Sequence, residues 1–174
     1  VPAEVPVARL APSWSRKVAH ELVEFDERDP CLVNIKDSRT LASAAAVRAT
    51  CGFQAGQHAW TITVDVCSDW SYVGFVDEAW RPSSPSPLGR GPGAWAVASS
   101  GAVYAGREEV ARLQSFGAGS RVGFRVDLDA RVADVIIDGK EFPGVFRRLP
   151  SPLFPAVSNC RSPARYVLAL GAAD

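Results

Sequence analysis

Residues 120–140 constrain the fold more than any other segment of the chain. Apolar side chains stand at every second position over 122–128, and after the polar turn at Asp129 the same alternation resumes over 133–137. An apolar period of two with turn-forming residues at both ends is typical of an antiparallel β-hairpin that is buried on one face. The sequence therefore predicts two paired strands here and a sheet with one face against a core.

Short apolar segments of strand length recur along most of the chain. Residues 58–66 alternate cleanly, and Trp60 is the largest side chain on their apolar face. The 13 prolines and 14 glycines separate further segments of this kind, which are 31–35, 72–76, 94–98, 153–158 and 166–170. Many short strands with no repeat of fixed length favour an all-β fold, a bent antiparallel two-sheet β-sandwich, over a propeller or a solenoid.

The N-terminal residues predict a different local structure. Three apolar residues at helical spacing follow a serine cap within 15–25, which indicates a short helix. The preceding segment 1–12 is rich in proline and alanine and has no period, as in a surface arm. We therefore expect an N-terminal arm with a short helix over 1–25 and a β-sandwich domain over 26–174.

The charge balance argues against several classes of partner. Lysine plus arginine and aspartate plus glutamate both number 19, so no net field draws the chain to nucleic acid or to an anionic membrane surface. The longest apolar runs, such as 42–47, are far shorter than the roughly 20 residues that span a bilayer. We expect neither nucleic-acid binding nor membrane insertion.

The spacing of the four cysteines indicates in which cellular compartment the chain is found. Cys31, Cys51, Cys67 and Cys160 are widely spaced, and none belongs to a Cys-x-x-Cys pair. A domain of 174 residues does not need disulfides for stability, so we expect reduced thiols and an intracellular, cytoplasmic location. Because the sequence contains no methionine and begins at Val1, we also expect it to be part of a larger multidomain chain.

The sequence offers little for catalysis, metals or cofactors. The two histidines, His20 and His58, are too few for acid–base or metal chemistry. Asp127 and Asp129 flank the hairpin turn, where carboxylates form turns. The glycine-rich segment 89–93 precedes a strand and lacks the Gly-Lys-Ser/Thr ending of a phosphate loop. We expect no enzyme activity, no catalytic residue, no metal and no cofactor.

Four segments read in order resemble the SPRY domain family. Gly56 to Trp60 resembles the Gly-x-His-x-Trp entry into a strand, and 72–76 resembles the Val-Gly-Val strand of that family. Residues 94–101 resemble its Trp-Gly segment, and 116–158 resemble its long C-terminal signature. The resemblance implies a bent β-sandwich without catalytic activity, whose loops bind a short peptide or a protein surface. Family members often occur beside ubiquitin-ligase modules.

The resemblance also implies where a partner binds. In the SOCS-box adaptors of this family, a peptide pocket uses an arginine before the Gly-x-His-x-Trp entry, the residues before the Val-Gly strand, and the turn after the Pro-Ala-Val-Ser strand. The long loop 81–93, rich in proline and glycine, adds a further surface, since long loops in compact domains are often functional. The candidate partner-binding residues are Arg48, Trp70, Ser71, Trp80, Arg81, Leu88, Gly89, Asn159, Cys160 and Arg161.

The two loop tryptophans also allow other interpretations of what the chain binds. Trp70 and Trp80 lie in polar loop sequence, where an exposed tryptophan is a residue type enriched at binding hot spots; alternatively, each folds back over a sheet edge. A lectin-like sandwich would stack a sugar on one of these two side chains. An architectural domain would instead dock against other parts of its own protein and would expose apolar area for that purpose.

Overall fold

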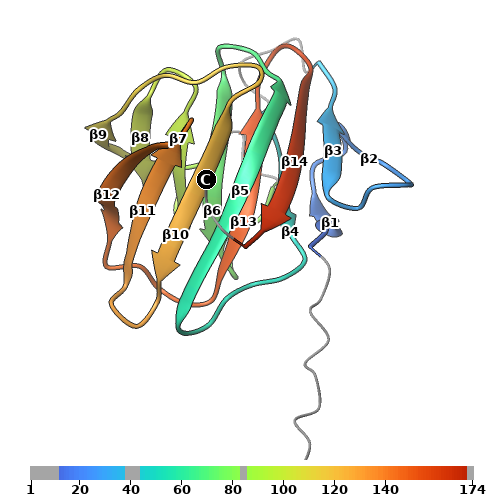
Figure 1. The fold of residues 1–174 in the computed structure, drawn as a ribbon. Coiled ribbons are helices and arrows are strands. Elements are labelled where there is room, and N and C mark those ends of the chain that lie inside the picture. The colour runs from blue at the N-terminus through green and yellow to red at the C-terminus, as the bar shows by residue number, and fades with distance from the viewer. Residues whose placement is uncertain (1–11, 38–43, 83–85, 172–174) are drawn as a thin grey trace, which may run out of the picture.

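The chain folds into two antiparallel β-sheets that pack face to face (Figure 1). The computed structural model describes residues 12–37, 44–82 and 86–171. The strands are β1 Trp14–Ala19, β2 Val23–Phe25, β3 Leu32–Ile35, β4 Ala45–Ala49, β5 Gln57–Val66, β6 Ser71–Asp77, β7 Ala94–Ala98, β8 Ala102–Ala105, β9 Glu108–Arg112, β10 Arg121–Asp127, β11 Val132–Ile137, β12 Lys140–Arg147, β13 Leu153–Asn159 and β14 Ala164–Leu170. Sheet A has the order β1-β4-β13-β6-β7-β8-β9, and sheet B has the order β12-β11-β10-β5-β14-β3-β2. The predicted two-sheet β-sandwich is confirmed.

The hairpin predicted over 120–140 is formed by β10 and β11. Phe124 lies opposite Val135 in one ladder and opposite Trp60 of β5 in the other. The Asp127 carboxylate closes the turn, because it accepts the backbone N–H groups of Asp129 (3.0 Å) and Ala130 (2.8 Å). These bonds hold the pKa of Asp127 below its usual value, as expected for a turn-forming carboxylate.

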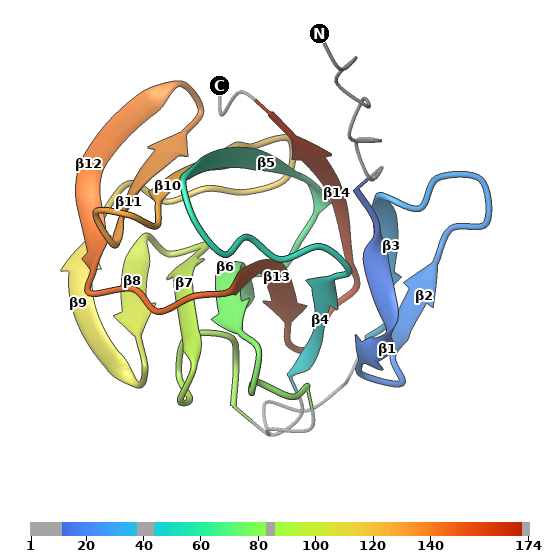
Figure 2. The same cartoon turned by 90° about the horizontal axis from the view of Figure 1, so that it is seen from below.

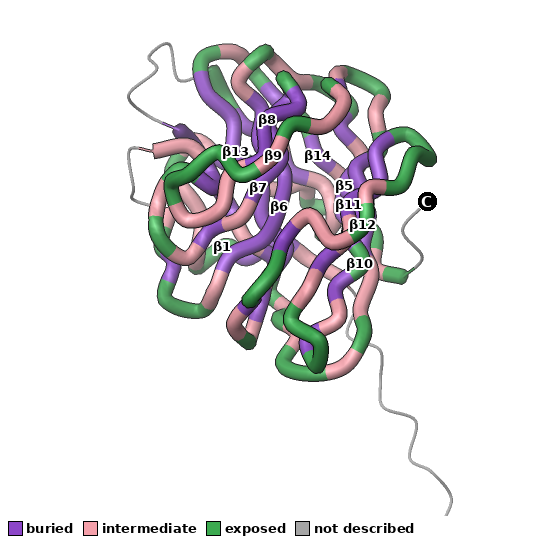
Figure 3. Tube along the Cα trace, turned by 90° about the vertical axis from the view of Figure 1, so that its left-hand side faces the viewer, coloured by how far each residue is buried: buried purple, intermediate pink, exposed green. Residues whose placement is uncertain are grey.

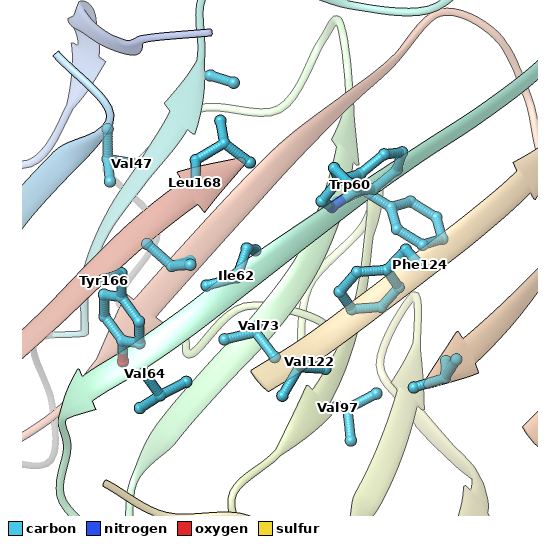
Figure 4. Close-up of a cluster of buried hydrophobic side chains, with 14 of the residues drawn as sticks. Val47, Trp60, Ile62, Val64, Val73, Val97, Val122, Phe124, Tyr166 and Leu168 are labelled. Atoms are coloured by element: carbon cyan, nitrogen blue, oxygen red, sulfur yellow. The ribbon is translucent and has the colours of Figure 1, made fainter. Parts of the chain in front are cut away.

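Aromatic rings fill the centre of the core between the sheets (Figure 4). Trp60 and Phe124 of sheet B and Phe75 of sheet A lie with their ring centroids 5.5 to 5.9 Å apart. Trp60 is fully buried, as its place in an alternating strand predicted. Trp95 is partly buried and stacks on Phe75 at 5.7 Å, so it also belongs to the core.

The helix predicted over 15–25 is wrong. Residues 14–19 and 23–25 are strands, and a turn between them is closed by the Val23 N–H donating to the His20 carbonyl (3.0 Å). β1 pairs with β4 in sheet A, and β2 pairs with β3 in sheet B. Pairing with β4 and β3 overrides the helical spacing of Val18, Leu22 and Phe25. Residues 1–11 of the predicted arm lie outside the described residues.

A second apolar cluster covers the face of sheet A that points away from sheet B, which we call the outer face. Alanines such as Ala94, Ala96 and Ala156 form a flat floor there, and Trp80 and Leu88 of the β6–β7 connection lie on it. Figure 2 shows the two sheets as layers, with this connection on the outer side of sheet A. β6 is therefore buried along almost its whole length (Figure 3), because both of its faces are covered.

Two further features concern the environment of the chain. None of the four cysteines forms a disulfide, in agreement with the predicted free thiols. Within residues 12–37, 44–82 and 86–171, no helix is long and apolar enough to cross a bilayer.

Candidate functional site

The candidate residues lie on or beneath the outer face of sheet A and form two separate groups. Near the start of β13, Arg48 lies over the Phe154 ring and shares the Glu78 carbonyl with Arg81; we call this group the arginine end. Just beyond the end of β13, Trp70 and Arg161 lie beside Asn159; we call this group the tryptophan end. Phe154 and Asn159 are about 17 Å apart along an extended strand, so a ligand that touches both ends must be an extended segment or a protein surface.

At the arginine end, an aromatic ring supports the guanidinium of Arg48. The Arg48 guanidinium carbon lies 4.0 Å from the centroid of the Phe154 ring, and its Nη1 donates to the Glu78 carbonyl at 3.4 Å. The Nε of Arg48 is buried, and no described residue forms a hydrogen bond with it. Burial, and then the positive charge of Arg81, lower the pKa of Arg48 from its usual value, although an arginine remains charged at neutral pH.

Arg81 approaches the same carbonyl from the β6–β7 connection. Its Nη1 donates to the carbonyls of Glu78 and Trp80, each at 2.8 Å. The turn that carries it starts at Asp77, whose carboxylate accepts the Trp80 N–H at 2.9 Å. An open hollow of about 350 Å³ adjoins Arg81 and is bounded by Trp80 and the glycine- and proline-rich residues 86–87 and 91–93.

A glycine makes room for the ring beneath Arg48. A Cβ atom at Gly52 would lie 2.6 Å from the nearest carbon atoms of the Phe154 ring. No real Cβ contact is that close, so only glycine at this position leaves the ring where it supports Arg48. The position of the Phe154 ring beneath Arg48 therefore depends on Gly52 in the β4–β5 connection as well as on β13.

The tryptophan end is built on a buried polar network. The side chain of Asn159 donates to the carbonyls of Ser162 (2.5 Å) and Cys160 (3.3 Å) and accepts the Ser68 hydroxyl (3.1 Å). These bonds fix the turn that carries Arg161, whose guanidinium carbon lies 5.9 Å from the Trp70 ring. Trp70 is partly buried, and its carbonyl accepts the Cys160 N–H at 3.1 Å.

The predicted residues differ in their access to a partner. Arg81 and Arg161 are exposed, and Arg48 and Trp70 are partly exposed. The others are buried and shape the face from beneath; they are Ser71, Trp80, Leu88, Gly89, Asn159 and Cys160. Trp80 is only 9% exposed. The structure therefore supports the interpretation in which Trp80 folds back over the sheet.

A hydrogen bond attaches the β6–β7 connection to sheet A between the two ends. Leu88 of the connection donates its N–H to the Ser158 hydroxyl of β13 at 2.9 Å.

Three residues of this face were missing from the sequence-based set. Phe154 supports Arg48, and an exposed Arg90 places its guanidinium carbon 5.2 Å from the ring of Tyr104. Phe154 and Tyr104 could have been found from the alternation of β13 and β8, since both project outward beside core residues. Arg90 lies between two glycines in an irregular connection, and no periodic signal places such a side chain.

His58 has a structural environment. Its Nε2 lies 2.6 Å from the Ala55 carbonyl oxygen, and its ring stacks on Phe53 with centroids 4.2 Å apart. His58 belongs to β5 of sheet B and is not on the outer face of sheet A.

Comparison with known proteins identifies the fold. The SPRY domain family model matches residues 57–171. The SPRY domain of human HERC1 superposes with a TM-score of 0.74 at 15% sequence identity, over 90% of this chain and 97% of that one. The PSpry domain of TRIM65 gives a TM-score of 0.66 at 17% identity, over 92% of each chain. Stonustoxin gives 0.70 at 15% identity, over 92% of this chain and 27% of the toxin chain. No curated protein matches the sequence significantly.

Proposed function

Because this chain belongs to the SPRY domain family, we propose that it is a non-catalytic protein-interaction module that binds a short peptide segment of a partner protein on the outer face of sheet A. The observation that carries the proposal is the arrangement of Arg48 on the ring of Phe154, at the rim of the covered face. Arginine and aromatic side chains on a rigid scaffold are the residue types that dominate binding energy at protein interfaces. The module would serve as the recognition part of a multidomain protein, for example a ubiquitin ligase.

The two ends supply different parts of the binding energy. Trp70 and Phe154 offer apolar area, and Arg48, Arg81 and Arg161 offer charged donors to backbone or side-chain oxygens of the ligand. A bound segment that spans about 17 Å would need roughly five extended residues. This length suits a short linear segment docked across the β6–β7 connection.

The two rival functions find less support. A sugar-binding sandwich would need an open aromatic platform, but Trp80 is buried and Trp70 only partly exposed. A domain that docks within its own protein would expose a large apolar area; in the described part of the chain, the exposed large hydrophobic residues are Val66 and Val110. These two residues lie in different sheets.

Selection from a phage-displayed library of random twelve-residue peptides tests the proposal. We expect the chain to enrich a consensus sequence, and a synthetic peptide of that sequence to bind at least tenfold more weakly to the Arg48→Ala and Trp70→Ala variants. Arg147→Ala is the matched control, because Arg147 is exposed on β12 of sheet B. Failure to enrich any peptide, or unchanged affinity in both variants, would reject the proposal. Binding on a glycan array that is lost in Trp70→Ala would favour the lectin instead.

A further inference from the structure

The arginine end holds two cations close together on a neutral acceptor. The guanidinium groups of Arg48 and Arg81 both donate to the Glu78 carbonyl, at 3.4 and 2.8 Å. Among the described residues, none places a carboxylate oxygen within 4.0 Å of either guanidinium. Two exposed arginines on other strands differ, since Arg112 and Arg125 pair with Glu109 and Glu141 at 2.6 and 2.7 Å.

Two like charges at one point are unfavourable unless an anion lies between them. The positive charge of Arg81 acts on Arg48 more strongly than the negative charge of Glu78 alone or of Asp77 alone. The Asp77 carboxylate accepts a hydrogen bond from the Trp80 N–H, which holds it in the turn. Asp77 and Glu78 therefore lie near the two guanidinium groups without a carboxylate–guanidinium contact within 4.0 Å among the described residues.

Both guanidinium groups also have more N–H donors than the hydrogen bonds seen here use. A guanidinium has five N–H donors in a planar fork, and the bonds seen here use only Nη1 of each residue. The Phe154 ring beneath Arg48 fixes the plane of that fork. A carboxylate is the acceptor that matches such a fork, because its two oxygens accept two parallel N–H bonds.

We propose that the peptide segment recognised by this face carries an aspartate or glutamate side chain, and that its carboxylate lies between the guanidinium groups of Arg48 and Arg81. This inference rests on the proposed function and adds the charge of the ligand to it. The carboxylate brings a negative charge to two cations whose hydrogen bonds otherwise go to the backbone carbonyls of Glu78 and Trp80. An amide side chain of the same shape accepts fewer bonds and brings no charge.

The peptides selected on the unmodified chain test this inference directly. We expect aspartate or glutamate at one fixed position of the consensus sequence. Replacing that residue by asparagine or glutamine should weaken binding to the unmodified chain about tenfold or more. The same replacement should change affinity less than twofold for the double variant Arg48→Gln/Arg81→Gln, because the carboxylate has then lost both partners, and by an intermediate factor for Arg81→Gln, which keeps Arg48.

Two controls separate this inference from the proposed function and from misfolding. Arg147→Gln removes one exposed charge from sheet B and should leave the tenfold preference intact. Arg81→Gln alters an exposed side chain, so its melting temperature should equal that of the unmodified chain. A consensus without an acidic residue, or an acidic preference that survives in the double variant, would overturn this inference and leave the proposed function standing. A selection that enriches no peptide would overturn both.

Discussion

The hydroxyl group of Ser71 in sheet A is hydrogen-bonded to the hydroxyl group of Tyr166 in sheet B. Both side chains are fully buried, and the Tyr166 hydroxyl also lies 3.2 Å from the Ser158 carbonyl oxygen, to which it donates. A polar bridge thus crosses an otherwise apolar core directly beneath the tryptophan end. Because buried polar groups cost free energy when they lack partners, this bridge fixes how the two sheets align under that end.

Tyr166→Phe should lower the free energy of unfolding by about 1–3 kcal/mol. The substitution keeps the ring but leaves the Ser71 hydroxyl and the Ser158 carbonyl without this partner. Urea denaturation measures the change. Tyr104→Phe is a matched control, because Tyr104 is partly exposed on the outer face, and it should change stability by less than about 0.5 kcal/mol. Equal effects of the two substitutions would contradict a structural role for the bridge.

The stability of the protein should fall at alkaline pH. Burial raises the pKa of the Tyr166 hydroxyl well above its usual value of about 10. The folded state therefore favours the neutral phenol, so this contribution is fully present below about pH 10 and is lost as the pH rises further. Urea denaturation between pH 8 and pH 11 should show this decline. Tyr166→Phe should flatten it in part, with Tyr72 providing a remaining slope because burial also raises its pKa. An unchanged slope would contradict the assignment.

Gly74→Ala should destabilise the sandwich by about 3 kcal/mol or more. Gly74 lies in the middle of β6, opposite Ala96 and Ala156 in the two ladders. A Cβ atom at this position would lie 1.9 Å from the Trp95 carbonyl oxygen, and backbone in the next strand cannot move aside cheaply. Gly117→Ala is the control, because its Cβ would meet no atom within 4 Å. Thermal unfolding of both variants gives the comparison, and similar melting temperatures would refute the steric argument.

The central strands could be predicted from sequence because their signal is local. In β5, β10 and β11, the face toward sheet A is buried and much of the other face is more exposed, so apolar residues alternate over most of each strand. Edge strands carry no such signal. β9, Glu108–Arg112, is exposed at every residue except the partly buried Ala111, and it was not predicted. The spacing of Val18, Leu22 and Phe25 predicted a helix because two short strands and a turn happened to place apolar residues at helical intervals.

The candidate face was predicted only in part, for a similar reason. The family resemblance named Arg48, Trp70 and Arg161 as candidates and the long loop added Arg81, and the structure places them around the outer face of sheet A. Whether a side chain in the β6–β7 connection faces solvent depends on where that connection runs, and its course is set by contacts with distant strands. The bond from Leu88 to Ser158 joins residues 70 positions apart, and no local pattern encodes it.

The two loop tryptophans should respond to substitution in opposite ways. Trp80 is almost fully buried on the alanine floor of sheet A, so Trp80→Ala should lower the free energy of unfolding by about 3 kcal/mol. Trp70 is only partly buried at the rim, so Trp70→Ala should cost about 1 kcal/mol, a shift in melting temperature of about 2–4 °C. Peptide affinity should show the reverse order at a temperature where both variants are folded, because in the proposed complex Trp70 contacts the ligand and the buried Trp80 supports the surface from beneath. Calorimetric unfolding and titration of a selected peptide measure the two quantities. A Trp70→Ala variant that loses more stability than Trp80→Ala, or that binds the peptide unchanged, would reverse the assignment of these residues.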